Sequence, residues 1–232
     1  MAGRVAYYGG IVKDGLVLNL DAAKLDSYPR TGTTWRDISG NQNNGTLVNG
    51  PTFNSGNGGN IVFDGVDDYS LGIFTFTKTN IITINLWGKY NTLPNTGNRG
   101  LFQIQNGGIV PSTQIKTIGG WLNTQGRMWG RVIDTSGEKN LPQVLASTIL
   151  TNNWYYFSYV ADGSNYKLYI NGDFKTQIDY NGTILEYDRI FLATQGTEPS
   201  NCNISNVTIY NQSLTQEKVL QNYNATKGRY GL

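Results

Sequence analysis

The 232-residue chain contains no histidine and only one cysteine, Cys202. The absence of histidine excludes Ser-His-Asp and Cys-His catalytic arrangements and the zinc sites that use imidazole ligands. A single cysteine cannot form a disulfide within the chain, so we expect Cys202 to be a small buried apolar residue. Carboxylates remain as the main candidates for catalytic groups.

Charge and long apolar runs are also scarce. Charged residues make up 15% of the chain and the formal net charge is +2, so we expect no binding of nucleic acid and no basic patch for a membrane. No apolar stretch is long enough for a membrane span or for the core of a secretory signal. We therefore expect neutral or protein partners, and synthesis in a cytosol without a cleaved signal.

Short strand-forming segments separated by turn residues run along the whole chain, which is typical of a sandwich or a barrel. The clearest is residues 154–172. Its first run, from Trp154 to Val160, is almost wholly aromatic or β-branched, and its second run carries an apolar row at alternate positions from Tyr166 to Ile170. Asp162-Gly163 supplies the turn between them. This pattern predicts a β-hairpin at the centre of one all-β domain.

Two more features complete the predicted domain. Leu16, Leu18 and Leu20 alternate with Val17, Asn19 and Asp21, which predicts a first strand with one buried face. Near the C-terminus, Ser213 and Gln216 match a capping box, with Thr215 as an alternative cap, and an apolar stripe follows. We divide the chain into an N-terminal arm (1–13), a β domain (14–212) and a C-terminal helix and tail (213–232).

The N-terminal arm holds Arg4, Tyr7 and Tyr8 before the flexible pair Gly9-Gly10. Large aromatic side chains on such an arm offer contact area, so we assign these three residues to partner docking. A frayed terminus without a function is the alternative.

Glycoside hydrolysis requires two carboxylates that face one glycosidic bond. Glu186 and Asp188 are two positions apart, as on one face of a strand, but Phe191 stands where β-sandwich glucanases carry a further acid. We therefore assign no catalytic residue and expect that the chain is not an enzyme.

Two clusters are candidates for ligand binding. Asp64, Asp67 and Asp68 offer carboxylate oxygens to calcium, although turn formation explains them equally well. Trp87, Trp121 and Trp129 are candidates either for an aromatic platform under sugar rings or for core residues. We assign no metal ligand or cofactor, with calcium as the possibility to test.

The order of several motifs resembles that of laminin-G-like, concanavalin A-like jelly-roll domains. They are listed in chain order: residues 15–21, the Asn- and Gly-rich loop 35–46, residues 63–69, the hairpin 154–172, and residues 204–211 running into the helix. The resemblance implies a two-sheet antiparallel jelly-roll sandwich with a short C-terminal helix. It does not imply one function, because such domains serve as lectins, adhesion modules, enzyme accessories and virion components.

The short arm before the first strand and the Asn-Tyr-Asn end of the helix are similar to structural proteins of tailed bacteriophages. That resemblance implies a non-enzymatic virion protein, either a capsid decoration or a tail or fibre component, assembled in the cytoplasm of the bacterial host. Its partners would be other virion proteins, and a homo-oligomer is a further option. The alternative is a carbohydrate-binding adhesion module for host or environmental glycans, and a glycan hydrolase is the third hypothesis.

Overall fold

The structure of the protein is a computed structural model that describes residues 9–74, 79–108, 116–184, 187–195 and 198–232. The predicted docking residues Arg4, Tyr7 and Tyr8, and Glu186, lie outside the described residues.

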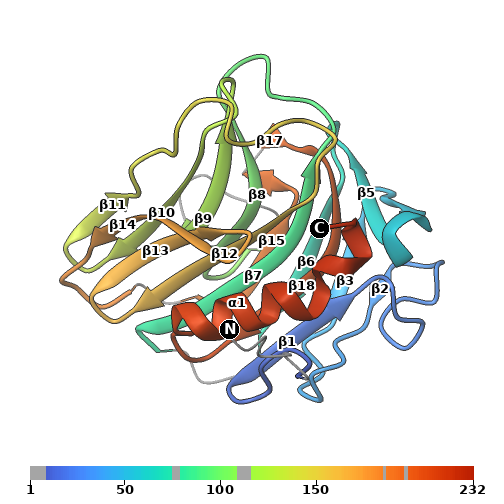
Figure 1. The fold of residues 1–232 in the computed structure, drawn as a ribbon, viewed down its shortest axis with the longest axis horizontal. Coiled ribbons are helices and arrows are strands. Elements are labelled where there is room, and N and C mark those ends of the chain that lie inside the picture. The colour runs from blue at the N-terminus through green and yellow to red at the C-terminus, as the bar shows by residue number, and fades with distance from the viewer. Residues whose placement is uncertain (1–8, 75–78, 109–115, 185–186, 196–197) are drawn as a thin grey trace, which may run out of the picture.

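Two antiparallel sheets face each other across the core, and one helix lies on the outer face of the first (Figure 1). Sheet A has the order β14 (Asp173–Asp179), β13 (Asn165–Ile170), β12 (Tyr155–Asp162), β7 (Ile81–Tyr90), β18 (Asn201–Tyr210), β5 (Asn60–Asp64) and β4 (Thr52–Asn54), and β1 (Leu16–Asp21) also pairs with β18. Sheet B has the order β11 (Gly137–Asn140), β10 (Met128–Asp134), β9 (Lys116–Asn123), β8 (Asn98–Gln105), β15 (Arg189–Leu192), β6 (Tyr69–Ile73), β3 (Gly45–Val48) and β2 (Thr34–Trp35).

The remaining elements are small. A two-stranded ribbon joins β16 (Thr194–Gln195) and β17 (Glu198–Pro199), and η1 (Gly56–Gly58) precedes β5. At the C-terminus α1 (Gln216–Thr226) continues into η2 (Lys227–Tyr230). In the part of the chain that the structure describes, no helix has the length and apolarity that crossing a bilayer requires. The predicted fold, an all-β jelly-roll sandwich of two antiparallel sheets with a short C-terminal helix, is confirmed.

The predicted hairpin forms β12 and β13 in the interior of sheet A. The turn between them contains Gly163, whose φ of 98° lies in the left-handed region that glycine tolerates. The apolar row from Tyr166 to Ile170 is buried in the main core, whereas Tyr169 points to the opposite face of the sheet and packs with Val219 of α1. Both faces of this hairpin are therefore covered, as its aromatic composition predicts.

The first strand differs from its prediction, because both faces of β1 are buried. A bulge between Leu16 and Leu18 changes the register, and Asn19 and Asp21 on the polar face are only 5% and 4% exposed. The C-terminal segment covers them: Arg229 of η2 donates from Nη1 and Nη2 to the two carboxylate oxygens of Asp21, at 2.7 and 2.8 Å. The prediction of a single buried face was wrong, because the alternation of residues along a strand does not reveal what packs against its polar side.

The C-terminal helix is held on sheet A by its cap and by aromatic packing. Thr215, rather than Ser213, is the N-cap, and its hydroxyl accepts a hydrogen bond from the Lys218 amide. At the other end, the ring of Tyr230 stacks on Trp87 with 3.9 Å between centroids. Cys202 of β18 is fully buried in the core, as predicted.

Candidate functional site

Three loops meet at one end of the sandwich and form a polar pocket of about 180 Å³, here called the rim pocket. The loops are the β5–β6 turn, the β7–β8 loop and the connection from β17 to β18. The lining consists of acidic, basic and amide side chains with two prolines, namely Asp64, Gly65, Thr92, Leu93, Pro94, Asn95, Arg99, Pro199 and Asn201.

Strand pairing positions the polar side chains of this pocket. Asp64 ends β5 directly opposite Asn201 at the start of β18. The turn that follows passes so close to β18 that a Cβ on Gly65 would lie 2.8 Å from the Asn201 backbone nitrogen, and the φ of Gly65 is 79°. Only glycine fits that turn without strain, so the close approach of the two strands depends on it.

Hydrogen bonds within the loops fix the orientation of the pocket's donors and acceptors. Asn91 donates from its amide nitrogen to the Oδ1 atoms of Asn201 and Asn203, both at 2.8 Å. Arg99 donates to the carbonyl oxygens of Thr96 and Asn98, at 3.3 and 3.1 Å, and lies 4.0 Å from the Glu198 carboxylate. A guanidinium, a carboxylate and oriented amides therefore converge on one small volume.

The predicted acidic cluster borders this pocket, and Asp64 belongs to both. One carboxylate oxygen from each of Asp64, Asp67 and Asp68 lies within 4.8 Å of the others. Among the described residues none of the three forms an ion pair with lysine or arginine. Burial, together with the charges of Asp64 and Asp67, raises the pKa of Asp68 above its ordinary value, although the Asp64 amide donates to it at 3.1 Å.

These three carboxylates fit calcium by the chemistry of the donor set. Calcium accepts oxygen ligands at about 2.3–2.6 Å, so opposite ligands on one ion are about 5 Å apart. The 4.8 Å limit of the cluster is compatible with that span. A cation would also offset the burial and the repulsion by Asp64 and Asp67 that raise the pKa of Asp68. Asp64, Asp67 and Asp68 would hold the ion, and loop carbonyls or water would complete its shell.

The structure separates the three tryptophans that were considered for a sugar platform. Trp121 and Trp129 pair on the outer face of sheet B with 4.9 Å between ring centroids, and the Arg131 guanidinium lies 5.4 and 5.7 Å from those centroids. Trp87 lies on the other sheet, beneath Tyr230. Trp121 is fully buried and Trp129 is 9% exposed, so neither ring offers a free stacking face.

The acidic pair considered for hydrolysis is not assembled within the described residues, since Glu186 lies outside them. Asp188 binds its neighbour Arg189, with 2.6 Å between Oδ2 and Nη2, and accepts the Gly107 amide at 2.9 Å. This carboxylate therefore anchors the loop that follows β8. Phe191 is fully buried.

Arg99, Asn95 and Asn201 were not singled out from the sequence. Asn95 in the β7–β8 loop and Arg99 in β8 are close in sequence, whereas Asn201 lies in β18, far along the chain, so no local spacing relates it to them. The one signal that could have pointed to them is the dense turn chemistry of residues 91–99, which forms one wall of the pocket.

The comparisons with solved structures identify the fold. The binding domain of botulinum neurotoxin serotype D is 16% identical with a TM-score of 0.71, and the binding domain of Paraclostridial Mosquitocidal Protein 1 is 18% identical with a TM-score of 0.72; each alignment covers 92% of this chain and 52% of the other. A Trypanosoma rangeli sialidase in complex with the inhibitor DANA is 13% identical with a TM-score of 0.69, over 94% of this chain and 34% of the sialidase. The chain thus spans from a third to about half of these structures, and the similarity concerns the fold alone.

No curated protein sequence matches the chain. The family model described as the concanavalin A-like lectin/glucanases superfamily matches residues 56–220, from η1 to the middle of α1. This match includes the β5–β6, β7–β8 and β17–β18 loops that form the rim pocket. The chain therefore belongs to the concanavalin A-like lectin/glucanase superfamily.

Proposed function

We propose that the chain is a lectin-like adhesion module that binds a glycan in the rim pocket. The observation that carries this proposal is the convergence of Asp64, Arg99 and oriented amides on a volume of about 180 Å³. Each sugar hydroxyl is both a donor and an acceptor, so a pocket that mixes carboxylate, guanidinium and amide groups matches it.

The membership of a superfamily described by lectins and glucanases supports a glycan ligand. So does the similarity of fold to a botulinum neurotoxin DC binding domain whose structure was solved in complex with SialylT. The neighbouring carboxylates add a second element to the proposal. Calcium at Asp64, Asp67 and Asp68 would supply positive charge and open coordination positions for sugar hydroxyls.

A glycan array probed with the labelled chain tests the proposal, followed by titration of the best glycan in solution. Asn95→Ala removes one exposed amide from the pocket, and Asn181→Ala, an exposed amide in another loop, is the matched control. We expect Asn95→Ala to weaken glycan binding by about tenfold, the value of one good hydrogen bond, and Asn181→Ala to leave it unchanged. An array without any binding, with and without calcium, contradicts the proposal.

The calcium element is tested separately by titration calorimetry with calcium alone. Asp67→Asn removes one exposed carboxylate of the cluster, and Asp26→Asn removes an exposed carboxylate elsewhere with the same change of net charge. We expect calcium to bind the unaltered chain and the Asp26 variant but not the Asp67 variant. Equal calcium binding by all three proteins would reject the cluster as the site.

We further propose that this module belongs to the virion of a tailed bacteriophage, as a capsid decoration or a tail or fibre component. The resemblance noted in the sequence supports this placement. The arm with Arg4, Tyr7 and Tyr8 would dock the module onto another virion protein. Deleting residues 1–10 should then abolish incorporation into purified particles. Undiminished occupancy after the deletion contradicts the docking role, and absence of the protein from purified virions contradicts the placement.

The proposed role is non-enzymatic. Asp188 is held by Arg189 and by the loop after β8, which supports an anchoring rather than a catalytic role for that carboxylate. Incubation with a panel of β-glucans should give no turnover. If turnover appears and is lost in Glu186→Gln, the chain is a hydrolase and the non-enzymatic proposal fails.

A further inference from the structure

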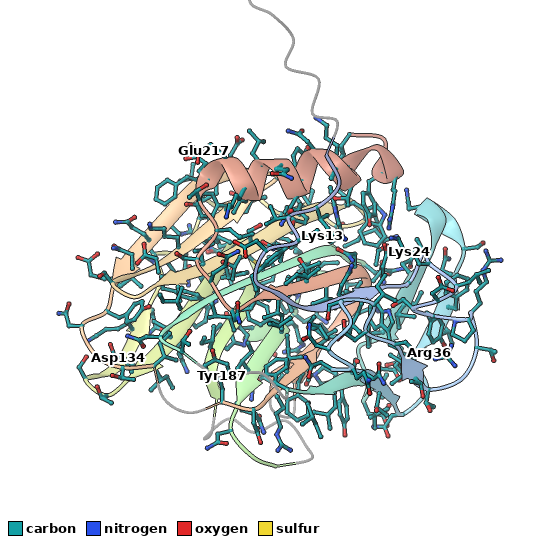
Figure 2. All side chains as sticks on the ribbon, turned by 90° about the horizontal axis from the view of Figure 1, so that it is seen from below. Lys13, Lys24, Arg36, Asp134, Tyr187 and Glu217 are labelled. Carbon is teal, nitrogen blue, oxygen red and sulfur yellow. The ribbon has the colours of Figure 1, made fainter. Side chains whose placement is uncertain are left out.

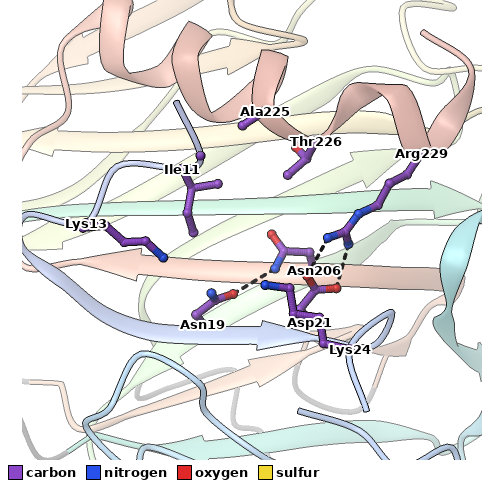
Figure 3. Close-up of a pocket in the computed structure, with 10 residues that line it drawn as sticks. Ile11, Lys13, Asn19, Asp21, Lys24, Asn206, Ala225, Thr226 and Arg229 are labelled. Atoms are coloured by element: carbon purple, nitrogen blue, oxygen red, sulfur yellow. Dashed lines mark hydrogen bonds and ion pairs between the residues drawn. The ribbon is translucent and has the colours of Figure 1, made fainter. Parts of the chain in front are cut away.

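A second pocket lies on the helix side of sheet A, on the far side of the core from sheet B (Figure 3). It encloses about 170 Å³ between the segment that precedes β1, the polar face of β1 and the end of the C-terminal helix. We call it the helix-side pocket. Its lining consists of charged, amide and small side chains: Gly10, Ile11, Lys13, Asn19, Asp21, Lys24, Asn206, Ala225, Thr226 and Arg229.

Hydrogen bonds between distant parts of the chain build this pocket. Asn222 of α1 accepts the Val12 amide at 2.8 Å, and Tyr210 of β18 donates to the Val12 carbonyl at 2.9 Å. Gln221 of α1 donates to the Gly10 carbonyl at 3.0 Å. These bonds fix the wall formed by residues 10–13 against the helix, so the pocket is set by the fold itself.

The charges that line the pocket do not cancel. Asp21 supplies the one carboxylate, and it is neutralised by the two bonds from Arg229. Lys13 and Lys24 form no ion pair with any residue that the structure describes. Two positive charges are therefore left over in the lining.

The free donors in the pocket point inward. Figure 3 shows Lys13 and Lys24, which come from two different segments, with their side chains directed toward the space beside Asn19 and Asn206. The side-chain amide of Asn206 donates hydrogen bonds to Asn19 Oδ1 and to the Leu20 carbonyl, at 3.1 and 2.9 Å. The Asn19 amide nitrogen has no partner among the described residues and faces the same space. Two ammonium groups and one amide donor thus surround a volume without a free anion.

We propose that the helix-side pocket binds a small oxyanion, namely a carboxylate, phosphate or sulfate group. Such a group accepts hydrogen bonds from ammonium and amide donors, and charge assistance makes these bonds stronger than neutral ones. The volume of about 170 Å³ is below that of pockets for drug-sized ligands, so it suits one anionic group with a small attached body. Lys13 and Lys24 are the principal ligands, and Asn19 orients the anion.

This site is independent of the rim pocket, with which it shares no residue. The carboxylate of an acidic glycan and a free phosphate ion would both bind to these donors. The test therefore compares inorganic phosphate, sulfate, acetate and glucuronate as anions with glucose as the neutral sugar. Binding is measured by titration calorimetry or by NMR of backbone amides at low ionic strength, because salt screens exposed charges.

Lys13→Gln/Lys24→Gln is the test variant, and it should fold because both side chains are exposed. Lys139→Gln/Lys175→Gln is the matched control, since it makes the same change of net charge on β11 and β14 at the opposite edge of the sandwich (Figure 1). We expect at least one anion to saturate a single site in the unaltered chain and in the control. The same anion should bind the test variant at least about tenfold more weakly.

Three results would overturn the proposal. They are the absence of saturable anion binding in the unaltered chain, an equal loss in the test and control variants, and binding of glucose as tight as that of glucuronate. Preference for phosphate and sulfate over acetate and glucuronate identifies an inorganic or phosphorylated ligand, and the reverse preference identifies a carboxylate. Failure of glycan binding at the rim pocket leaves these readouts unaffected.

Discussion

At the scale of single residues, the polar groups of β1 show how charge is handled inside this fold. Asp21 is 4% exposed, yet its carboxylate is satisfied by Arg229 and by the Ala23 amide at 3.1 Å. Hydrogen bonding to Asp21, together with the attraction of its charge, raises the pKa of Arg229 above its ordinary value. A buried ion pair of this kind contributes little beyond an apolar pair, but removing one partner leaves a charge without compensation.

Arg229→Ala should therefore lower the free energy of unfolding by about 3 kcal/mol. Arg36→Ala, an exposed arginine whose side chain forms no ion pair among the described residues, should change it by no more than about 0.5 kcal/mol. Urea denaturation of both variants measures the difference. Adding Asp21→Asn to the Arg229 variant should restore part of the loss, and a double-mutant cycle without coupling would contradict this account.

Asp68 shows the opposite case, a carboxylate held without a basic partner. Because its folded-state pKa is raised, mainly by burial, the folded protein binds more protons than the unfolded chain between the ordinary carboxylate pKa and the raised value. The contribution of Asp68 to stability therefore decreases as the pH rises through that window.

Urea unfolding of the unaltered chain and of Asp68→Asn, measured from pH 3 to pH 8 without calcium, checks this sign. The stability of the unaltered chain relative to the variant should decrease with rising pH and then level off above the folded-state pKa. Asp26→Asn, an exposed carboxylate, is the control and should show no such trend. A relative stability that increases with pH would mean that the Asp68 carboxylate is stabilised in its charged form.

At the scale of elements, the hairpin and the C-terminal helix depend on each other. Figure 2 shows the helix lying along one side of the sandwich, with Asp134 and Tyr187 on the other side. The β13–β14 turn reaches up to the helix: Asn171 and Gly172 have φ values of 56° and 84°, and a Cβ on Gly172 would lie 2.8 Å from Leu220 Cδ1. The β12–β13 turn has a similar glycine without that contact, since a Cβ on Gly163 would meet only Ile81, at 3.9 Å.

Alanine substitutions at these two glycines distinguish the cost of backbone strain from the cost of disturbed packing. Gly163→Ala should cost about 1 kcal/mol of stability, because alanine disfavours the left-handed region. Gly172→Ala should cost at least about 1 kcal/mol more, because the added methyl group displaces Leu220. Thermal and urea unfolding measure both values. Equal costs would show that the helix accommodates the methyl group without loss.

At the scale of the whole molecule, one core joins both sheets and includes Cys202 on β18. Burial raises the pKa of this thiol above its ordinary value, and β18 is paired along both edges, with β7 on one and β5 and β1 on the other. A reagent cannot reach the sulfur unless these pairings separate. Modification of Cys202 therefore requires a global opening of the sandwich.

Cys202 should thus react with a thiol reagent at least about 10⁴-fold more slowly in the native protein than in the unfolded chain, given ordinary domain stability. Ser55→Cys, which places a second thiol at an exposed position, is the control and should be labelled at once. Mass spectrometry after timed labelling, with urea as the variable, measures both thiols. Rapid native labelling of Cys202 would indicate local opening of β18.

The sequence by itself determined the fold class and the hairpin, because alternation of apolar and aromatic residues is a local property that a strand must satisfy. It also determined that Cys202 would be buried and that carboxylates were the remaining catalytic candidates. Asp64, Asp67 and Asp68 could be identified as a group because one turn holds them together.

Only the tertiary structure decided which polar residues share a pocket. Asn19 and Asp21 are neighbours in β1, whereas Arg229 lies near the C-terminus. The bulge in β1 and the docking of η2 bring the three side chains together. Arg99 lines one pocket with Asp64 and Asn201 only because β5 and β18 pair while the β7–β8 loop lies at their ends. Long-range pairing is fixed by burial and register over the whole sandwich, and no local pattern of residues encodes it.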